Sequence, residues 1–505
     1  MAGFEPTTSA SRTQRATKLR HIPKNSELLR RLKNRFIKRA KRNYKAARAR
    51  LQAFGVAPTS GTASNRGICP AKLSLMSNAV STPNSDHETI DDAQIIADFS
   101  AHVNPALAQV LQFIGFTSTE SEARGCIVRD STGREFLDCL GGYGTMSLGH
   151  SHPRIVAAAK GQLDKMAFSS RVLFNAPQAA LAKKLAEISP GDLQFAFFCN
   201  SGAEAAEAAI KFARITTGRK KLISVEAAYH GKTMGALSVS GRNKYKTPFA
   251  PLITDVQTIP FNNIEALSAI DKETAAFLIE PIQGEGGINI ASDKYLQAAR
   301  RRCDEVGALL VMDEVQSGLG RTGQMWGCDH AGVAPDMMLL AKALSGGAIP
   351  IGAVLGTPKV WEFWNDAPLI HSSTFGGNPL ACAVGLETLQ IIEDEDLVAK
   401  SARAGEILIA KLRETQSKYP NLVKDVRGRG LMIGIEFPHE DITSLVLAGL
   451  AQRDVLVVPY TFNNPTVTRF EPPLNISDSE IEWAANAFDE ACAATAELLE
   501  GVSEM

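Results

Sequence analysis

The chain has 505 residues, of which 45% are hydrophobic and 21% charged, a composition typical of a globular protein with more than one domain. No apolar run reaches the roughly 18 residues of a membrane span, so we expect no membrane partner. The eight cysteines occur singly, with no Cys-x-x-Cys pair and no histidine cluster at metal-ligand spacing. We therefore expect free thiols, no metal site and a cytoplasmic location.

The formal net charge of zero hides an asymmetry along the chain. Residues 1–75 contain 18 of the 54 Lys and Arg but only 2 of the 54 acidic residues, and 26–54 has the pattern of a basic amphipathic helix. We expect a disordered extension, or a start assigned too far upstream with Met76 as the true start. An organelle transit peptide and a lipid-binding segment are the alternatives. No nucleic-acid partner is expected, because no aromatics interleave the basic residues in a binding motif.

Short apolar runs alternate with helical segments between about 178 and 378. The expected strands are 193–199, 221–225, 275–279 and 308–312, and the expected helices include 203–217 and 293–306. Buried strands that alternate with helices predict a parallel α/β sheet. After about residue 386 we expect a new helix, a strand at 431–437 and further helices.

A Ser-Gly turn joins a predicted strand to a predicted helix at Asn200-Ser201-Gly202-Ala203-Glu204. The free amides at a helix N-terminus, together with a glycine that permits close approach, form an anion site. Many strand-to-helix turns carry Ser and Gly for purely structural reasons, so this motif alone is a weak indication of phosphate binding.

A carboxylate closes an apolar strand at Val311-Met312-Asp313-Glu314. Ligands of open α/β sheets collect at this end of the strands, where Asp313 could pair with a cationic ring nitrogen. The alternative is an ordinary strand-end acid that caps the next turn.

Lys342 stands in the apolar run Leu340-Ala341-Lys342-Ala343-Leu344, 29 residues after Asp313. A buried amine is costly to keep charged, and in its neutral form it is a nucleophile that can form a Schiff base. The alternative is a lysine that extends its amine from an apolar surface to water. A phosphate cradle, an acid and a lysine together match the needs of pyridoxal phosphate.

From about residue 102 to 499 the chain resembles the class III aminotransferases of fold type I, which use pyridoxal 5′-phosphate. The stretches that carry the resemblance are NSGAEAAEAAIKFAR, YHGKTMGALSVSG, IEPIQGEGG, MDEVQSGLGRTG, DMMLLAKALSGG and HSSTFGGNPLAC. The segments HVNPAL, FLDCLGGYG, FFCNSG, PIQGEGG and FNNPTVTRFEPPL are similar to the putrescine subgroup of that family.

The resemblance implies an α/β fold with two domains. A large cofactor-binding domain, residues 166–385, would contain a mostly parallel sheet flanked by helices. A smaller α+β domain would be built from both chain ends, residues 76–165 and 386–505.

The resemblance also implies roles for individual residues. Lys342 would form the Schiff base with the cofactor and then move the proton, and Asp313 would pair with the ring nitrogen. Gln316 would bond the ring hydroxyl. The residues expected at the phosphate and the ring face are Ser201, Gly202, Ala203, Tyr229 and His230. Thr374 would reach the phosphate of the neighbouring subunit's cofactor, which implies a homodimer or a dimer of dimers.

Three further residues bear on the substrate. Arg469 matches the family's carboxylate-binding arginine, and Glu285 matches the glutamate that masks it. Lys232 departs from the arginine that related ornithine, acetylornithine and 4-aminobutyrate enzymes carry. Lysine lacks the planar fork that suits a carboxylate, and a diamine donor would not need one.

The expected function is transfer of a terminal amino group from a diamine such as putrescine to 2-oxoglutarate, giving an aminoaldehyde and glutamate. One alternative is an ornithine, acetylornithine or other ω-amino-acid aminotransferase, whose substrate carboxylate would have to find Arg171, Lys232 or Arg469. A more remote alternative is a cofactor-binding protein without catalytic activity.

Overall fold

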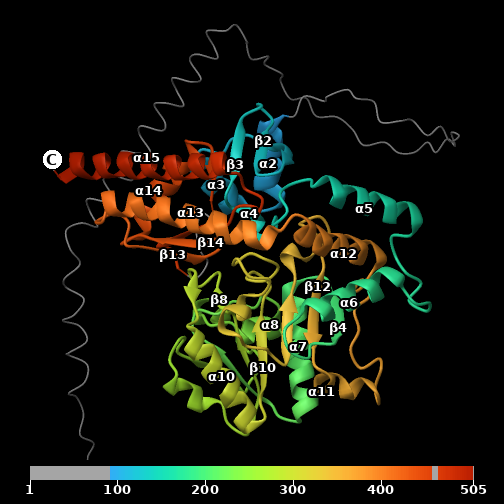
Figure 1. Ribbon diagram of the computed structural model, residues 1–505. Coiled ribbons are helices and arrows are strands. Elements are labelled where there is room, and N and C mark those ends of the chain that lie inside the picture. The colour runs from blue at the N-terminus through green and yellow to red at the C-terminus, as the bar shows by residue number, and fades with distance from the viewer. Residues whose placement is uncertain (1–90, 458–463, 504–505) are drawn as a thin grey trace, which may run out of the picture. The chain divides into compact units, whose positions relative to one another are not determined.

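The computed structural model describes residues 91–457 and 464–503, and Asp91–Glu497 form one compact unit (Figure 1). The basic segment expected at 1–75 lies outside the described residues. Within the described ranges, no helix is long and apolar enough to cross a membrane. The same ranges contain no group of three or more His, Cys, Asp or Glu side chains that could hold a metal ion.

A seven-stranded sheet, in the order β4-β12-β11-β10-β7-β5-β6, forms the centre of this unit. Its strands are β4 (Phe195–Cys199), β5 (Lys221–Val225), β6 (Val256–Ile259), β7 (Thr274–Ile279), β10 (Leu309–Asp313), β11 (Met337–Leu340) and β12 (Gly352–Gly356). The pairs β10–β7, β10–β11, β5–β6 and β5–β7 are parallel. Within the sheet, β12 runs against both of its neighbours. The mostly parallel sheet expected from the sequence is confirmed.

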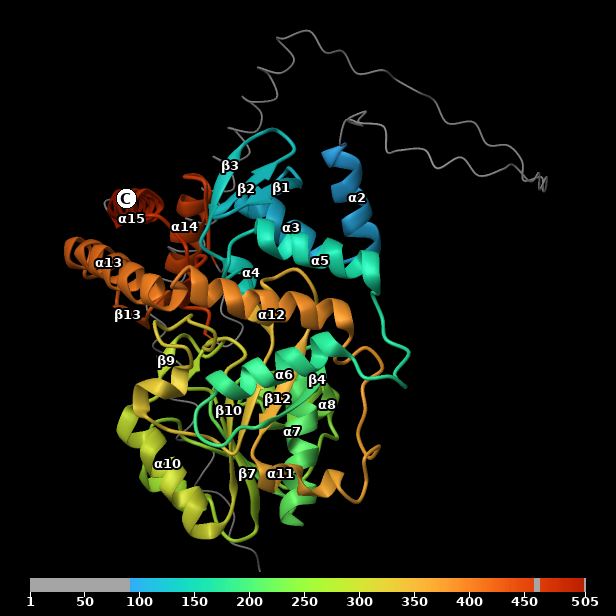
Figure 2. The same cartoon turned by 45° about the vertical axis from the view of Figure 1, so that its right-hand side comes forward.

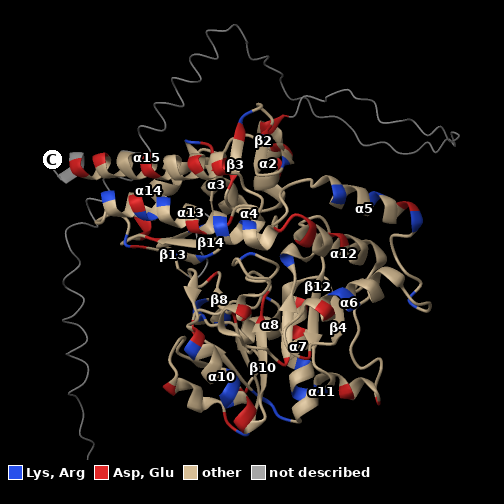
Figure 3. Ribbon diagram, in the orientation of Figure 1, with Lys and Arg blue, Asp and Glu red and all other residues tan. Residues whose placement is uncertain are grey.

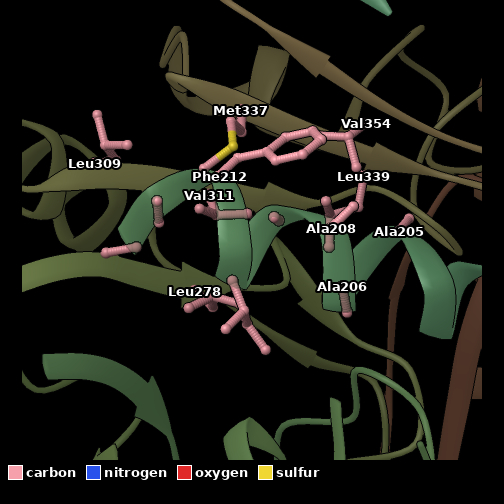
Figure 4. Packing of buried hydrophobic residues seen from close by; sticks show 14 of the residues in the cluster. Ala205, Ala206, Ala208, Phe212, Leu278, Leu309, Val311, Met337, Leu339 and Val354 are labelled. Atoms are coloured by element: carbon pink, nitrogen blue, oxygen red, sulfur yellow. The ribbon is translucent and has the colours of Figure 1, made fainter. Parts of the chain in front are cut away.

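Helix α7 (Gly202–Thr217) covers one face of this sheet and packs across β7, β11 and β12 (Figure 4). Phe212 reaches from the helix into a cluster that contains Leu309 and Val311 of β10. The helix can approach closely because its buried face carries small side chains: Ala205, Ala206, Ala208, Ala209 and Ala213. Helix α10 (Asp293–Val306) contacts β7 and β10 without joining that cluster, so both faces of these fully buried strands are covered.

Three smaller sheets complete the fold. The first, in the order β1-β2-β3-β15, joins strands from opposite ends of the chain. Its strands are β1 (Glu120–Arg124), β2 (Ile127–Asp130), β3 (Glu135–Asp138) and β15 (Val455–Leu456). The others are formed by β13 (Asp425–Arg429), β14 (Met432–Glu436) and β16 (Val467–Phe470), and by β8 (Ile282–Gln283) with β9 (Asn289–Ile290). The domain boundaries expected at residues 166 and 386 stay a prediction.

The remaining helices lie around these sheets (Figures 1 and 2). They are α2 (Asp92–His102), α3 (Pro105–Ile114), α4 (Gly141–Gly144), α5 (Pro153–Lys165), α6 (Ala176–Ile188), α8 (Met234–Val239), α9 (Asn243–Lys246), α11 (Pro358–Trp361), α12 (Pro379–Asp394), α13 (Leu397–Lys418), α14 (Glu440–Ala451) and α15 (Asp478–Ser503). Short 3-10 turns are η1 (Thr247–Phe249), η2 (Glu265–Ala269), η3 (Gly327–Ala331), η4 (Lys342–Ser345) and η5 (Glu362–Trp364). Charged residues gather on helices and loops, whereas the central strands are mostly uncharged (Figure 3).

One helix start differs from expectation. The helix predicted to begin after about residue 386 is α12, and it begins at Pro379. Asn378 caps it, with its side chain accepting a hydrogen bond from the backbone N–H of Ala381 at 2.8 Å. Proline is favoured in the first turn because the amide that it lacks would have no partner there. The Asn-Pro pair was therefore the signal for the true start.

Candidate active site

Several strands of the central sheet end at one cavity. Their parallel members present their carboxyl ends at the same edge, where ligands bind in open α/β sheets. A cavity of about 530 Å³ lies there. Its lining comes from the segments that follow β4, β5, β7, β10 and β11, and includes Ser201, Tyr229, Glu280, Asp313 and Lys342.

The first turn of α7 forms one wall of the cavity. Ser201 is the N-cap residue, and its Oγ accepts a hydrogen bond from the backbone N–H of Glu204 at 3.2 Å. Gly202 and Ala203 begin the 16-residue helix, so the first N–H groups of the helix lie beside the cavity and can bind an anion. Gly231 approaches this turn closely, because a Cβ atom there would lie 2.6 Å from Cβ of Ala203.

Asp313, which is 6% exposed, is the last residue of β10. Its Oδ1 accepts a hydrogen bond from the backbone N–H of Val315 at 3.0 Å, and its Oδ2 lies 2.7 Å from Nδ1 of His230. Burial lowers the pKa of His230, but the hydrogen bond and charge of Asp313, with the charge of Glu280, outweigh burial and raise that pKa. The raised pKa favours the protonated ring of His230, whose charge would offset that of Asp313.

Glu280 is a buried carboxylate that holds two loops at the cavity. Its Oε2 accepts from the backbone N–H of Tyr229 at 2.9 Å, and its Oε1 from the backbone N–H of Gly284 at 3.2 Å. Burial raises the pKa of Glu280 to about 7, and the charge of Asp313 acts in the same direction. His230 and the two backbone N–H groups oppose this rise.

Lys342 follows β11 and begins the 3-10 turn η4, against which α12 packs. Its φ of 43° lies in the left-handed region, a strained conformation for a residue with a side chain. Burial lowers the pKa of its amine, although the charges of Glu471, Glu285 and Asp313 act in the opposite direction. A lysine with a lowered pKa is more often neutral, and the neutral amine is the nucleophile.

Gln316 and Tyr229 also line the cavity. Nε2 of Gln316 donates a hydrogen bond to Oε1 of Glu471 at 2.6 Å and lies 3.4 Å from the backbone oxygen of Tyr143. Tyr229 is half-buried, and burial together with the charge of Glu285 raises the pKa of its hydroxyl. At neutral pH this phenol is therefore uncharged.

Arg469 and Glu285 form an ion pair behind Gln316. Arg469 lies on β16 and is fully buried, and its terminal nitrogen NH2 donates to Oε1 of Glu285 at 2.7 Å. A Cβ atom at Gly284 would lie 2.0 Å from Oε1 of Gln316 and 3.4 Å from the other terminal nitrogen of Arg469, so the two side chains adjoin the same glycine. Neither Arg469 nor Glu285 belongs to the lining of the cavity as the described residues form it.

The other two predicted residues lie in different places. Lys232 lines the cavity and is exposed, with its Nζ 5.5 Å from the centre of the Tyr245 ring. Thr374 is exposed and is not part of the lining that the described residues form. The structure therefore brings most of the predicted residues to one cavity, places Arg469 and Glu285 behind it, and leaves Thr374 outside.

Two buried acidic residues of the site were missed from the sequence. Glu280 directly follows the apolar strand β7, just as Asp313 ends β10, so its position at a strand end was a usable signal. Glu471 is fully buried beside Gln316 and comes two residues after Arg469. Nothing in the sequence indicated that contact, because 155 residues separate Glu471 from Gln316.

These side chains fit the cofactor that the sequence analysis expects. The α7 N-terminus can bind a phosphate, buried Asp313 can pair with a cationic ring nitrogen, and Lys342 presents an amine to an aldehyde. Nε2 of His230 is buried and has no hydrogen-bond partner among the described residues, so a polar group in the cavity could use it. All four features border a single cavity.

We predict that Glu280 makes the stability of the protein depend on pH. Its pKa rises from the ordinary 4.5 to about 7 in the folded state, so the folded form binds the proton more tightly than the unfolded form. The free energy of unfolding should therefore fall as pH rises through this window, by at most about 3 kcal/mol. Glu280→Gln mimics the protonated form. Its melting temperature minus that of wild type should therefore rise from about pH 4.5 to about pH 7 and then level off.

Thermal unfolding followed by circular dichroism at pH values from about 4.5 to 8 measures this difference. The matched control is Glu305→Gln, whose side chain is 63% exposed and whose melting difference should not change with pH. A difference for Glu280→Gln that is constant with pH would contradict the assignment.

Comparison with known proteins agrees with this geometry. The family model for class III aminotransferases matches residues 115–492. Two structures of the ornithine aminotransferase from Toxoplasma gondii are 34% and 33% identical to this chain with a TM-score of 0.74, and they match over 81% of this chain and 96% of theirs. One of the two reveals partial occupancy of pyridoxal phosphate at its active site.

Two bacterial transaminases are also similar. A transaminase from the marine bacterium Virgibacillus is 29% identical over 80% of this chain and 100% of its own, with a TM-score of 0.76. A thermostable omega transaminase mutant from Pseudomonas jessenii is 27% identical over 77% of this chain and 95% of its own, with a TM-score of 0.71. The family match spans well over half of the chain. This chain therefore belongs to the class III aminotransferases and is an enzyme that uses pyridoxal phosphate.

Proposed function

We propose that this transaminase moves the terminal amino group of a diamine such as putrescine to 2-oxoglutarate, giving an aminoaldehyde and glutamate. The observation that carries the proposal is the 2.7 Å bond between Arg469 and Glu285. With one terminal nitrogen of Arg469 bonded to Glu285, that glutamate competes with the carboxylate of a donor for the guanidinium. A donor without a carboxylate does not need Arg469, so the ion pair does not weaken its binding.

Ser201, Gly202, Ala203, Asp313 and Lys342 are the residues proposed to hold the cofactor. Ser201, Gly202 and Ala203 would hold the phosphate at the α7 N-terminus, and Asp313 would pair with the protonated ring nitrogen. When bound, pyridoxal phosphate supplies an electron sink for the substrate carbon. Lys342 would hold the cofactor through its amine, and the same amine would move the proton during transfer.

Other residues orient the ring. Gln316 could donate one amide hydrogen to the ring hydroxyl in exchange for its long 3.4 Å bond to the backbone oxygen of Tyr143, while it keeps its 2.6 Å bond to Glu471. Tyr229 provides an aromatic surface for one ring face. His230 holds Asp313 in place at 2.7 Å.

Replacing Lys342 tests the attachment. Lys342→Ala should reduce turnover below detection while contacts at the α7 N-terminus retain some cofactor. Turnover and the absorbance of the bound cofactor should be measured together. Lys359→Ala, at an exposed lysine outside the cavity, is the control and should behave as wild type. Full activity of Lys342→Ala would refute the role.

The presence of lysine at position 232 favours a donor without a carboxylate. It occupies the position where related enzymes for carboxylate-bearing donors have arginine, and it lines the cavity. An ammonium is a point charge and lacks the bidentate fork that a carboxylate prefers. The site therefore gives a carboxylate-bearing donor a weaker partner than an arginine would.

The acceptor, unlike the diamine, needs Arg469 to be available to a carboxylate. We infer that Arg469 leaves Glu285 when 2-oxoglutarate enters and then grips the carboxylate through both terminal nitrogens. The guanidinium is already poorly bonded, because its Nε and NH1 nitrogens have no hydrogen-bond partner among the described residues. A carboxylate would satisfy these groups.

An ω-amino acid such as ornithine is the second candidate donor. The similarity to the ornithine aminotransferase of Toxoplasma gondii favours it. Of the residues considered for its carboxylate, Arg171 is exposed and donates to the backbone oxygen of Gly376 at 2.7 Å, outside the cavity lining. That leaves Lys232 and Arg469.

Single-turnover absorbance of the holoenzyme without acceptor decides between the donors. We expect putrescine to remove the absorbance band of the bound cofactor, and ornithine, acetylornithine and 4-aminobutyrate to change it little. Lys232→Arg should increase the response to the three amino acids by supplying a planar fork. Lys244→Arg is the matched control, since Lys244 also lies over the Tyr245 ring but outside the cavity lining.

A fast response to ornithine with putrescine inert would replace the diamine proposal by the second candidate. A similar response of both lysine variants would show that Lys232 does not select the donor.

We also propose that the enzyme is a homodimer in which Thr374 serves the neighbouring site. Thr374 is exposed on a segment that presents Leu369 at 85% and Phe375 at 60% exposure. A second exposed apolar segment includes Val172 at 87% exposure and Phe174, whose side chain is fully exposed. Phe168 and Phe375 connect the two segments, with ring centres 4.9 Å apart. Exposed apolar surface of this kind supports association with another subunit.

Hybrid dimers test the sharing of the site. Lys342→Ala and Thr374→Asp subunits should each give inactive homodimers, because one lacks the attachment and the other places a carboxylate at the phosphate. When co-expressed with different tags, the purified hybrid should regain about half of the wild-type activity, since one of its two sites carries neither defect. Inactive hybrids would place Thr374 in its own subunit's site.

We propose a cytoplasmic location for the reaction. The seven cysteines within the described ranges are all buried and free. Free thiols are typical of proteins in a reducing compartment, and this supports the location.

A further inference from the structure

The carboxylate of Glu471 is an unusual feature of the region behind the cavity. It directly follows β16 and is fully buried. Its Oε1 accepts from Gln316 at 2.6 Å, whereas its Oε2 has no hydrogen-bond partner among the described residues. The contact that Oε2 does make is with the NH1 nitrogen of Arg469, 3.7 Å away, too long for a hydrogen bond.

Glu471 makes this region richer in negative than in positive charge. Arg469 lies between two buried carboxylates, bonded to Glu285 at 2.7 Å and near Glu471 at 3.7 Å. One guanidinium and two carboxylates have a formal charge of −1. Burial weakens the screening by water, so this excess charge acts over several ångströms.

The excess charge reaches the cavity. Gln316 lines the cavity and is bonded directly to Glu471. Glu471 is also the strongest of the charges that raise the pKa of Lys342 against the effect of burial. The field of Glu471 therefore acts where the substrate must lie.

We propose that Glu471 sets the charge preference of the substrate site, favouring a donor with a cationic far end and opposing a dicarboxylate acceptor. The inference rests on the proposed diamine function, which it deepens. It assigns to this residue a selectivity that the ion pair of Arg469 and Glu285 alone would not provide, because one guanidinium and one carboxylate are neutral together. Glu471 acts through its field and through Gln316, so it is a positioning residue.

The two halves of the reaction give opposite consequences. The far ammonium of a diamine is attracted by the excess negative charge. The second carboxylate of the acceptor is repelled until it bonds to Arg469. Loss of the charge of Glu471 should therefore weaken binding of the diamine and strengthen binding of the dicarboxylate. Damage to the structure would instead weaken the binding of both.

Glu471→Gln tests this, because the amide oxygen can still accept from Gln316 while the charge is lost. Calorimetry with the holoenzyme and glutarate, a dicarboxylate without the reactive carbonyl, should show binding about tenfold tighter than in wild type. Single-turnover traces with putrescine, butylamine and 4-aminobutyrate compare far ends that are cationic, neutral and anionic at equal chain length. In Glu471→Gln, the single-turnover rate with putrescine, divided by the rate with butylamine, should fall about tenfold from its wild-type value. The same ratio for 4-aminobutyrate should rise about tenfold.

The control is Glu490→Gln, which removes a carboxylate with 66% side-chain exposure that pairs with Arg453, and which should change none of these values. If Glu471→Gln does not fold, Glu471→Ala should give the same changes in glutarate affinity and amine ranking. Glutarate affinity that does not increase, or equal losses with all three amines, would overturn the role of Glu471. Failure of the diamine function is distinguishable: wild type would then respond poorly to putrescine, while glutarate would still bind the Glu471 variant more tightly.

Discussion

Buried charge is the constraint on which this active site depends. Asp313, Glu280, Glu471 and Arg469 are nearly or fully withdrawn from water, and each requires a nearby dipole or opposite charge. Asp313 has His230 at 2.7 Å, and Glu280 has two backbone N–H groups. Arg469 has Glu285 but keeps two nitrogens without hydrogen bonds among the described residues. Asp313 and Glu280 thus have both carboxylate oxygens hydrogen-bonded, whereas Arg469 and Glu471 keep polar atoms without such bonds among the described residues.

The sheet provides that frame. Because its parallel strands end at one edge, Ser201, Glu280, Asp313 and Lys342 meet at one cavity although they come from distant parts of the chain. The alanine-rich face of α7 allows the helix to lie close against β11 and β12, so its N-terminus reaches the same edge. Packing of small side chains thus places the N-terminus of α7 beside the lysine and the carboxylate.

Some elements could be predicted almost to the residue. The strand Lys221–Val225 and the helix Asp293–Val306 have the expected bounds, because apolar runs and helical spacing depend on local sequence. The start of α12 at Pro379 was missed, since its cap depends on the Asn378 side chain rather than on periodicity. Asp313 was found through its place at a strand end. Glu280 has an equivalent place, and its two backbone donors became apparent only in the folded chain.

The sequence by itself determined the family, the cofactor and the mostly parallel sheet, because ordered motifs and buried strands are properties of local runs of residues. Only the tertiary structure decided which side chains meet across long separations. It placed Glu471 beside Gln316, 155 residues away, and His230 beside Asp313, 83 residues away. It also separated Thr374 from the cavity that holds Lys342. Such pairings follow from how the strands and loops pack, and a pattern along the chain does not encode that distance.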